Sequence, residues 1–305
     1  MRTSLRHVLS GAKRSLRGDF PRTASVAVAV VSPLSSGGGA FQGARQFSSA
    51  ETVSSFKGGQ LAPASSLRGT KRFYKEAVPV FNTDMEEWEV HLDGKTVKTP
   101  QRQVLSTPSE FLAMAVSQEW DAQEHYIEPS LMPLTGLVCA YRDQYPECLP
   151  SVTEELKRYL VTDTICFRAE KDTQRELYFQ QVELWDPLID WMRDSFGIVV
   201  GTADSVMLPV HGEDALERLD AVLNEMSDAE LCALYSVTTV CKSLTIGLAT
   251  VKRRITIDQA VEMARTEEEY QIKLWGMVEG GHDVDRAHIR VQLASASSFL
   301  WLQEF

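Results

Sequence analysis

The C-terminal half of the sequence follows a helical repeat almost throughout. Between residues 178 and 196, large apolar residues recur at intervals of four and three residues, and Gly197 follows at once. This spacing puts the apolar side chains on one face of a helix, and glycine is a favoured helix terminator. Further helices are expected at 214–225, from a capping residue at Ser227, from a second cap at Thr256 to the glycines at 280 and 281, and at 285–302. An all-helical domain is therefore predicted for residues 169–305.

A smaller region before residue 169 carries the signals of a sheet. Residues 88–92 alternate between apolar and polar side chains, Asp93-Gly94 supplies a tight turn, and residues 95–99 return as the second strand of a hairpin. Other expected elements are an extension of the sheet at Val104-Leu105, helices at 107–125, 134–143 and 152–160 with Thr107 capping the first, and a short strand at 164–168. The predicted fold class is α+β: a small α/β N-terminal domain at 71–168 with a β-hairpin-containing sheet, followed by the all-helical C-terminal domain.

The first 70 residues differ from the rest in charge. Residues 1–69 hold nine Lys or Arg and two acidic residues, a balance of +7, so the remaining residues must carry −18 to give the total of −11. A leader rich in Ser and Arg with almost no acid is typical of a mitochondrial transit peptide. We expect residues 1–47 to be that peptide, cleaved after Phe47, and residues 48–70 to be a flexible lead-in. The expected location is the mitochondrial matrix, with peripheral attachment to the inner membrane as an open alternative.

Composition and motifs exclude several classes of protein. A body with a charge of −18 would repel phosphates, so nucleic acid is not expected as a partner. The sequence has no phosphate-binding glycine loop, no dinucleotide fingerprint, no zinc-protease helix and no nucleophile elbow, so neither a cofactor nor catalytic residues are expected. The apolar run 231–251 contains Lys242 near its centre, which favours a buried core helix over a transmembrane segment. Five cysteines without a Cys-x-x-Cys pair fit reduced, mostly buried thiols.

Residues 267–275 place acidic side chains where a helix would bury apolar ones. Read as one continuous helix, residues 257–278 have two apolar stripes, and a glutamate interrupts each of them. A carboxylate on a buried stripe costs several kcal/mol unless it is paired, hydrogen-bonded or turned toward a partner. We therefore predict a protein-binding surface that consists of Glu267, Glu268, Glu269, Tyr270, Gln271 and Trp275.

A second segment has the same mixed character. Trp120 lies beside Glu119 and near Gln123 on the helix predicted at 107–125. Tryptophan is favoured as an interface anchor because it combines a large apolar area with a polar tip, but it is equally suited to a core. Glu119, Trp120 and Gln123 form a second, weaker candidate contact site.

The sequence alone leaves two other functional classes open besides a protein-binding chain. His282, Asp283 and His288 could ligate a divalent metal together with the glutamates at 267–269, which would make the chain a metal-dependent hydrolase. The simpler interpretation is that Asp283 and Asp285 begin the last helix, where the helix dipole favours acidic side chains. The other alternative is a structural subunit of a matrix complex.

Several short motifs follow one another between residues 72 and 276. They are Arg72-Phe73-Tyr74-Lys75, Leu92-Asp93-Gly94-Lys95 with Thr99-Pro100, Glu119-Trp120-Asp121-Ala122-Gln123, Met132-Pro133-Leu134-Thr135, Trp185-Asp186-Pro187-Leu188, and Glu268-Glu269-Tyr270-Gln271 with Trp275-Gly276. Together and in this order they resemble the ATP synthase mitochondrial F(1) complex assembly factor 2 family. The resemblance covers residues 71–305, whereas the first 70 residues match nothing in particular.

This resemblance implies a mitochondrial chaperone of the α subunit of the F(1) sector of ATP synthase, which needs no nucleotide. A free α subunit exposes interfaces meant for the β subunit, and exposed apolar area of that size drives aggregation. The chaperone is expected to shield that interface and to hand the α subunit to the β subunit during head assembly. The expected protein is a monomer without enzymatic activity, a transmembrane segment or a nucleic-acid partner.

Overall fold

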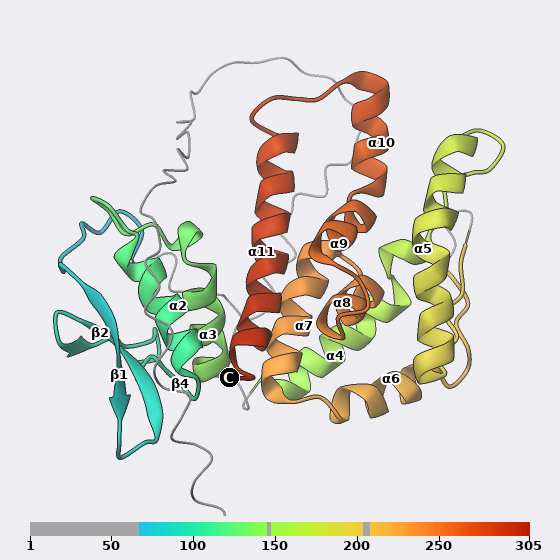
Figure 1. Cartoon of the computed structure of the whole chain (residues 1–305). Coiled ribbons are helices and arrows are strands. Elements are labelled where there is room, and N and C mark those ends of the chain that lie inside the picture. Colours follow the sequence, from blue (N-terminus) through green and yellow to red (C-terminus); the bar gives the residue numbers. More distant parts are fainter. Residues whose placement is uncertain (1–66, 145–147, 204–207) are drawn as a thin grey trace, which may run out of the picture. The chain divides into compact units, whose positions relative to one another are not determined.

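The computed structural model describes residues 67–144, 148–203 and 208–305. The expected transit peptide at 1–47 lies outside the described residues, as does most of the lead-in expected at 48–70. Figure 1 shows a small sheet near the start of the described chain and helices after it. The predicted α+β fold class is confirmed.

The sheet is built on the predicted hairpin. Its strands are β1 (Ala77–Asn82), β2 (Glu87–Leu92), β3 (Lys95–Thr96) and β4 (Ser106–Thr107), all paired antiparallel, in the order β1-β2-β3 with β4 also paired to β2. Asp93 and Gly94 both have positive φ, as the two-residue turn between β2 and β3 requires. The sequence does not predict strand β1, because its apolar residues do not alternate regularly with polar ones. It also contains Pro79, and proline within sheets is largely confined to edge strands.

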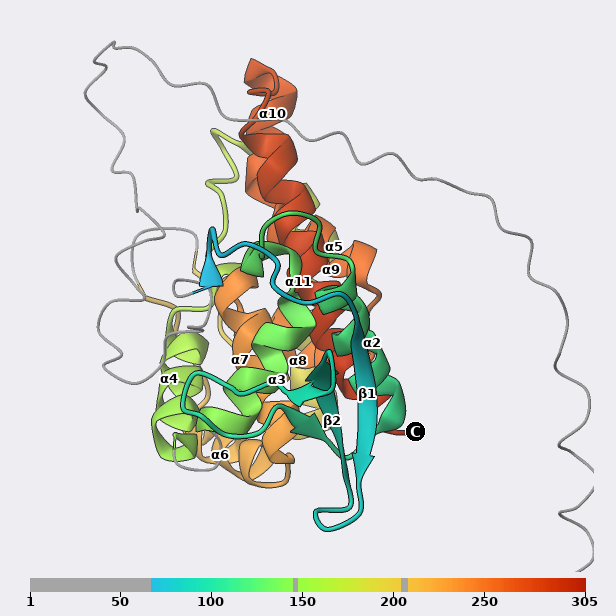
Figure 2. The same ribbon diagram turned by 90° about the vertical axis from the view of Figure 1, so that its left-hand side faces the viewer.

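Helix α2 (Glu110–Asp121) packs against β1 and β2, and α3 (Pro133–Gln144) packs against α2 (Figure 2). The N-cap of α2 is Ser109, whose hydroxyl oxygen accepts a hydrogen bond from the Leu112 amide at 3.3 Å. The cap predicted at Thr107 is wrong, because Thr107 belongs to β4 and its hydroxyl donates to the Ser109 carbonyl at 3.0 Å. Pro108 also holds the preceding residue in an extended conformation, so the helix starts after it.

Helices make up most of the remaining described chain. After α3 they are α4 (Leu149–Val161), α5 (Arg175–Phe196), α6 (Ala215–Asn224), α7 (Asp228–Cys241), α8 (Leu244–Val251), α9 (Ile257–Ala264), α10 (Thr266–Trp275) and α11 (His282–Leu302). A 3₁₀ turn, η1 (Pro129–Leu131), precedes α3, and another, η2 (Thr164–Cys166), follows α4. The long amphipathic helix is α5, and it ends as predicted at Gly197, which has a left-handed conformation. The capping boxes that begin at Ser227 and Thr256 are also present.

The apolar run 231–251 is not one helix. It forms parts of α7 and α8, which are separated at Lys242, a residue with a φ of 55°. The buried carboxylate of Asp163 fixes this break, because it accepts hydrogen bonds from the amide and the hydroxyl of Thr245, both at 2.9 Å. Asp163 also caps η2, so a 3₁₀ turn replaces the strand expected at 164–168. Within the described ranges, no helix is long and apolar enough to cross a membrane.

A second break lies at Arg265, between α9 and α10. The backbone of this residue has φ −114° and ψ 14°, and its side chain is 1% exposed. The helix expected from Thr256 to the glycines at 280 and 281 is therefore wrong as a single element. The two stripes read along 257–278 are not continuous, because the turn at Arg265 changes the direction in which the later side chains point.

The hydrophobic core runs across the boundary predicted at residue 168. Leu137 of α3, Leu234 of α7 and Phe299 of α11 all belong to it. The ring of Phe299 lies 5.9 Å from the ring of Tyr141 of α3, and α11 packs against both α3 and α7 (Figure 1). The division into domains at 71–168 and 169–305 stays a prediction. All five cysteines are free thiols, and all but Cys148 are buried.

Candidate functional site

The predicted protein-binding surface lies on α10, at one end of the helical part of the structure. Figures 1 and 2 show α10 and its connection to α11 beyond the ends of the neighbouring helices. Within α10, Thr266 is the one buried residue. The helix is therefore held mainly by polar contacts of its side chains, and these contacts decide which of its residues remain available to a partner.

Glu269 contributes to the junction of α9, α10 and α11. Its carboxylate is 3.1 Å from Nε of the buried Arg265 and 3.0 Å from Nε of Arg286 on α11. Arg265 also pairs with Asp285 in the first turn of α11. Burial works to raise the pKa of Glu269, but the two guanidinium groups outweigh it and lower that pKa. Glu269 is thus committed to internal ion pairs.

Glu267 points toward α5. Its Oε1 accepts a hydrogen bond of 2.9 Å from Nε2 of Gln181, which is fully buried. The other end of the Gln181 amide accepts a bond of 2.7 Å from the backbone of Ala169. Burial, reinforced by the neighbouring charge of Glu268, raises the pKa of Glu267. This glutamate is a half-buried link between α10 and α5.

Replacing Glu267 by glutamine tests this placement through pH dependence. A raised pKa means that the folded protein keeps a proton which the unfolded chain has already lost, so stability falls as pH rises through that interval. Glu267→Gln keeps the acceptor for Gln181 and has no charge to bury. We expect it to melt higher than wild type at about pH 8 and to lose this advantage near about pH 4. Thermal melts across that range measure the effect. Exposed Glu217→Gln, on α6, is the control. A Glu267→Gln protein that melts lower at every pH would contradict the placement.

Glu268, Gln271 and Trp275 are the exposed members of the predicted set. They are spaced three and four residues apart, so they share one face of α10, which we call the outer face. Trp275 is 77% exposed. The apolar surface continues at the end of the helix through a group of residues that we call the tip: Leu274, Met277 and Val278.

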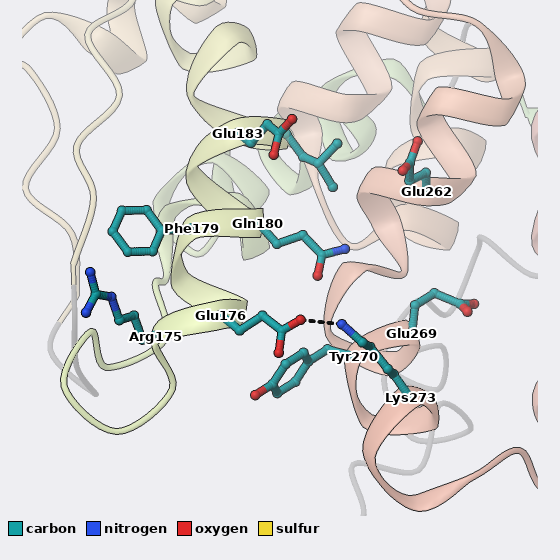
Figure 3. A pocket seen from close by; sticks show the side chains of 10 residues that line it. Arg175, Glu176, Phe179, Gln180, Glu183, Glu262, Glu269, Tyr270 and Lys273 are labelled. Atoms are coloured by element: carbon teal, nitrogen blue, oxygen red, sulfur yellow. Dashed lines mark hydrogen bonds and ion pairs between the residues drawn. The ribbon is translucent and has the colours of Figure 1, made fainter.

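Tyr270 is half-buried and lies on the opposite side of α10 from the outer face. Together with Lys273 it lines a groove between α10 and α5, shown in Figure 3. The predicted residues are therefore divided: Glu267 and Glu269 form internal polar contacts, Tyr270 and Glu269 line the groove, and the other three form the outer face. Sequence spacing alone could not make this division, because it depends on the turn at Arg265.

The second candidate contact site is internal. Trp120 is 4% exposed, and Glu119 accepts bonds from the amides of Leu134 and Thr135, at 2.8 and 2.7 Å, which caps the start of α3. Burial raises the pKa of Glu119 despite these bonds. Buried Gln123 lies just after α2, donates a hydrogen bond to the Glu119 carbonyl of that helix and accepts one from the Glu128 amide. These three residues stabilise the fold, so they are not part of the surface proposed below.

The metal alternative finds no support in the geometry. Within the described residues, no three His, Cys, Asp or Glu side chains converge where they could hold a metal ion. Nδ1 of His282 accepts a hydrogen bond from the Val278 amide at 3.2 Å, and Asp285 pairs with Arg265. Asp283 and Asp285 lie in the first turn of α11, as the simpler interpretation predicts.

Comparison with known proteins shows what the chain is similar to. Residues 71–193 match the model of the ATP12 chaperone protein family. Protein atp12, mitochondrial, from Schizosaccharomyces pombe is 25% identical over 74% of this chain and 81% of its own length. Protein ATP12, mitochondrial, from Saccharomyces cerevisiae is 26% identical over 76% of this chain and 84% of its own length.

A solved structure shows the same likeness. The crystal structure of Atp12 from Paracoccus denitrificans superposes with a TM-score of 0.68 and 29% identity, covering 76% of this chain and 98% of that one. The chain thus carries an ATP12 chaperone protein domain at residues 71–193 and is similar over about three quarters of its length to proteins named Atp12. This is the likeness that its motifs predict. A family described as a chaperone points to a role without catalysis.

Proposed function

We propose that this chain is a mitochondrial assembly chaperone that binds the free α subunit of the F(1) sector of ATP synthase. It shields the interface of that subunit from aggregation and hands it to the β subunit. The observation that carries the proposal is the ATP12 chaperone match at residues 71–193. We place the protein in the matrix, in line with the name of the two yeast relatives, each called mitochondrial.

We assign the first contact with the α subunit to the outer face of α10 and the adjoining tip. A tryptophan with 77% of its surface exposed, beside three exposed apolar residues, is a combination that marks interaction sites. Glu268 and Glu279 are exposed nearby and would favour a basic rim on the client. Such a modest surface binds the α subunit firmly enough to protect it, yet the larger interface of the β subunit can displace it.

Selective capture tests the function. The tagged mature chain is mixed with isolated α or β subunit, and co-purification of each is measured. We expect the α subunit to be retained, and released when β is added, because β covers the same interface. Retention of β alone, or of neither subunit, would contradict the proposal. Permanent co-purification with assembled ATP synthase would instead favour a structural subunit.

Two substitutions test the assignment of the outer face. Trp275→Ala removes the anchor and should weaken capture of the α subunit at least about tenfold. Glu268→Lys reverses the charge beside it and should weaken capture by a smaller factor, more strongly at low salt. Both residues are exposed, so both variants should melt like wild type.

Matched changes elsewhere serve as controls. Trp301→Ala removes another exposed tryptophan, near the end of α11, and Glu225→Lys makes the same charge reversal at the end of α6. Both controls should capture the α subunit normally. If Trp275→Ala and Glu268→Lys are folded and capture as well as their controls, the outer face is not the contact.

A further inference from the structure

A groove separates the N-terminal half of α5 from α9 and α10, with a volume of about 930 Å³. Figure 3 shows Glu176 and Gln180 of α5 pointing toward Tyr270 and Lys273 of α10, whereas Phe179 and Arg175 lie on the side of α5 away from α10. The polar contacts that join the two sides are the bond from Gln181 to Glu267 at 2.9 Å, the bond from the buried Trp185 indole to the Met263 carbonyl at 3.0 Å, and the Glu176–Lys273 pair. Apolar packing does not close the gap, so the groove remains open to solvent.

The groove is lined by charged and polar residues and by three apolar or aromatic side chains, Phe179, Leu184 and Tyr270. Phe179 is 46% exposed at the edge of the groove, Leu184 lies five residues further along α5, and half-buried Tyr270 lines the groove on the α10 side. These three side chains offer an apolar surface without an occupant among the described residues. The groove is open along its length, whereas sites for small molecules enclose most of their ligand.

The charges are separated along the groove. At one end, Arg175 stacks on Phe179 with its guanidinium carbon 5.6 Å from the ring centre, and the Glu176–Lys273 pair neutralises itself. At the other end, Glu183 and Glu262 make no ion pair with any described residue. Arg175 and Glu183 are eight residues apart on α5, a separation of about 12 Å along the helix.

We infer that this groove takes an amphipathic helical segment of the client, with Lys or Arg side chains at the end that meets Glu183 and Glu262. This inference rests on the proposed chaperone function and specifies the chemistry of the partner. The apolar face of the segment packs on Phe179, Leu184 and Tyr270, as helices do in apolar grooves of other recognition proteins. The two unpaired carboxylates set the direction of the segment and disfavour acidic ones.

Helix α10 then contacts the client on two opposite sides. Tyr270 and Lys273 line the groove, whereas Trp275 lies on the outer face. The opening of the groove depends on where the turn at Arg265 places α10 relative to α5. A bound segment would therefore join α5 to α10 more firmly than the two polar contacts do.

Labelled peptides test the inference with the mature chain. The probe has leucines on one helical face and lysines at one end of that face, and its partner probe carries glutamates instead of the lysines. Fluorescence anisotropy should detect binding of the lysine peptide and much weaker binding of the glutamate peptide. The double variant Glu183→Gln, Glu262→Gln should weaken binding of the lysine peptide about fivefold, and high salt should reduce the difference.

Further variants separate charge from packing. Glu183→Lys with Glu262→Lys should reverse the preference toward the glutamate peptide, and Phe179→Ala should weaken binding of both peptides. The matched control Glu217→Gln, Glu225→Gln removes two exposed carboxylates of α6 and should change neither affinity. Equal binding of both peptides to wild type, or an unchanged preference in the double lysine variant, would overturn the inference.

Capture of the isolated α subunit distinguishes a wrong assignment of the groove from a wrong proposed function. The groove variants are also assayed for capture of the isolated α subunit. If wild type captures the α subunit and the folded groove variants capture it equally well, the groove is not a client-binding site, and the proposed chaperone function is unaffected. If wild type captures no α subunit, the function itself is wrong, whatever the peptides do.

Discussion

Trp120→Ala is expected to lower the free energy of unfolding by about 3–5 kcal/mol. The side chain is 4% exposed, and its ring lies 5.8 Å from the ring of Tyr74. The Tyr74 hydroxyl also donates a 2.6 Å bond to the carbonyl of Trp120, which ties the N-terminal segment to the end of α2. Truncation leaves a cavity in the core beside Tyr74. Urea unfolding followed by circular dichroism measures the loss.

Trp120→Phe distinguishes a core role from a contact role. Nε1 of Trp120 has no hydrogen-bond partner among the described residues, so phenylalanine loses volume but breaks no side-chain bond that the structure contains. We expect a loss of about 1–2 kcal/mol and normal capture of the α subunit. A Trp120→Ala protein that is as stable as wild type but fails to capture the α subunit would return this residue to the contact surface.

Arg265→Met is expected to cost about 3 kcal/mol, at the lower end of the range for breaking a buried ion pair. The guanidinium is 1% exposed and bonds Glu269 and Asp285, so its removal leaves two carboxylates facing an apolar side chain. The cost stays moderate because Asp285 has 55% of its side chain exposed and can be solvated. Loss of the junction should also release α10, which weakens capture of the α subunit.

Arg286→Met is the matched control for Arg265. Its side chain bonds the same carboxylate of Glu269 but is 42% exposed. We expect a loss below about 1 kcal/mol and little change in capture. Urea unfolding of the two variants side by side measures the difference. Equal losses from both would show that burial of Arg265 does not dominate the junction.

The sequence predicts the elements whose signals are local. The repeat that ends at Gly197 and the capping boxes at Ser227 and Thr256 depend on residues within a few positions of one another. The breaks at Lys242 and Arg265 depend instead on distant partners, Asp163 in one case and Asp285 in the other. Periodicity cannot reveal such breaks, because the apolar pattern continues through them.

The candidate site shows the same limit. The exposure of Trp275 agrees with its predicted availability, but the inward bonds of Glu267 and Glu269 require Gln181, Arg265 and Arg286 in their folded positions. The groove is harder still to predict from the sequence, because the residues on its two sides lie about ninety positions apart in the chain. The junction at Arg265 has one local signal in the sequence, the four-residue spacing between Arg265 and Glu269, which allows an ion pair on a helix.

The decisive experiment is co-expression of this chain with the isolated α subunit. We expect the α subunit to be recovered in the soluble fraction with wild type, to stay largely insoluble with Trp275→Ala, and to be recovered normally with Trp301→Ala. An α subunit that is equally insoluble with and without the wild-type chain would contradict the claim that this protein is its chaperone.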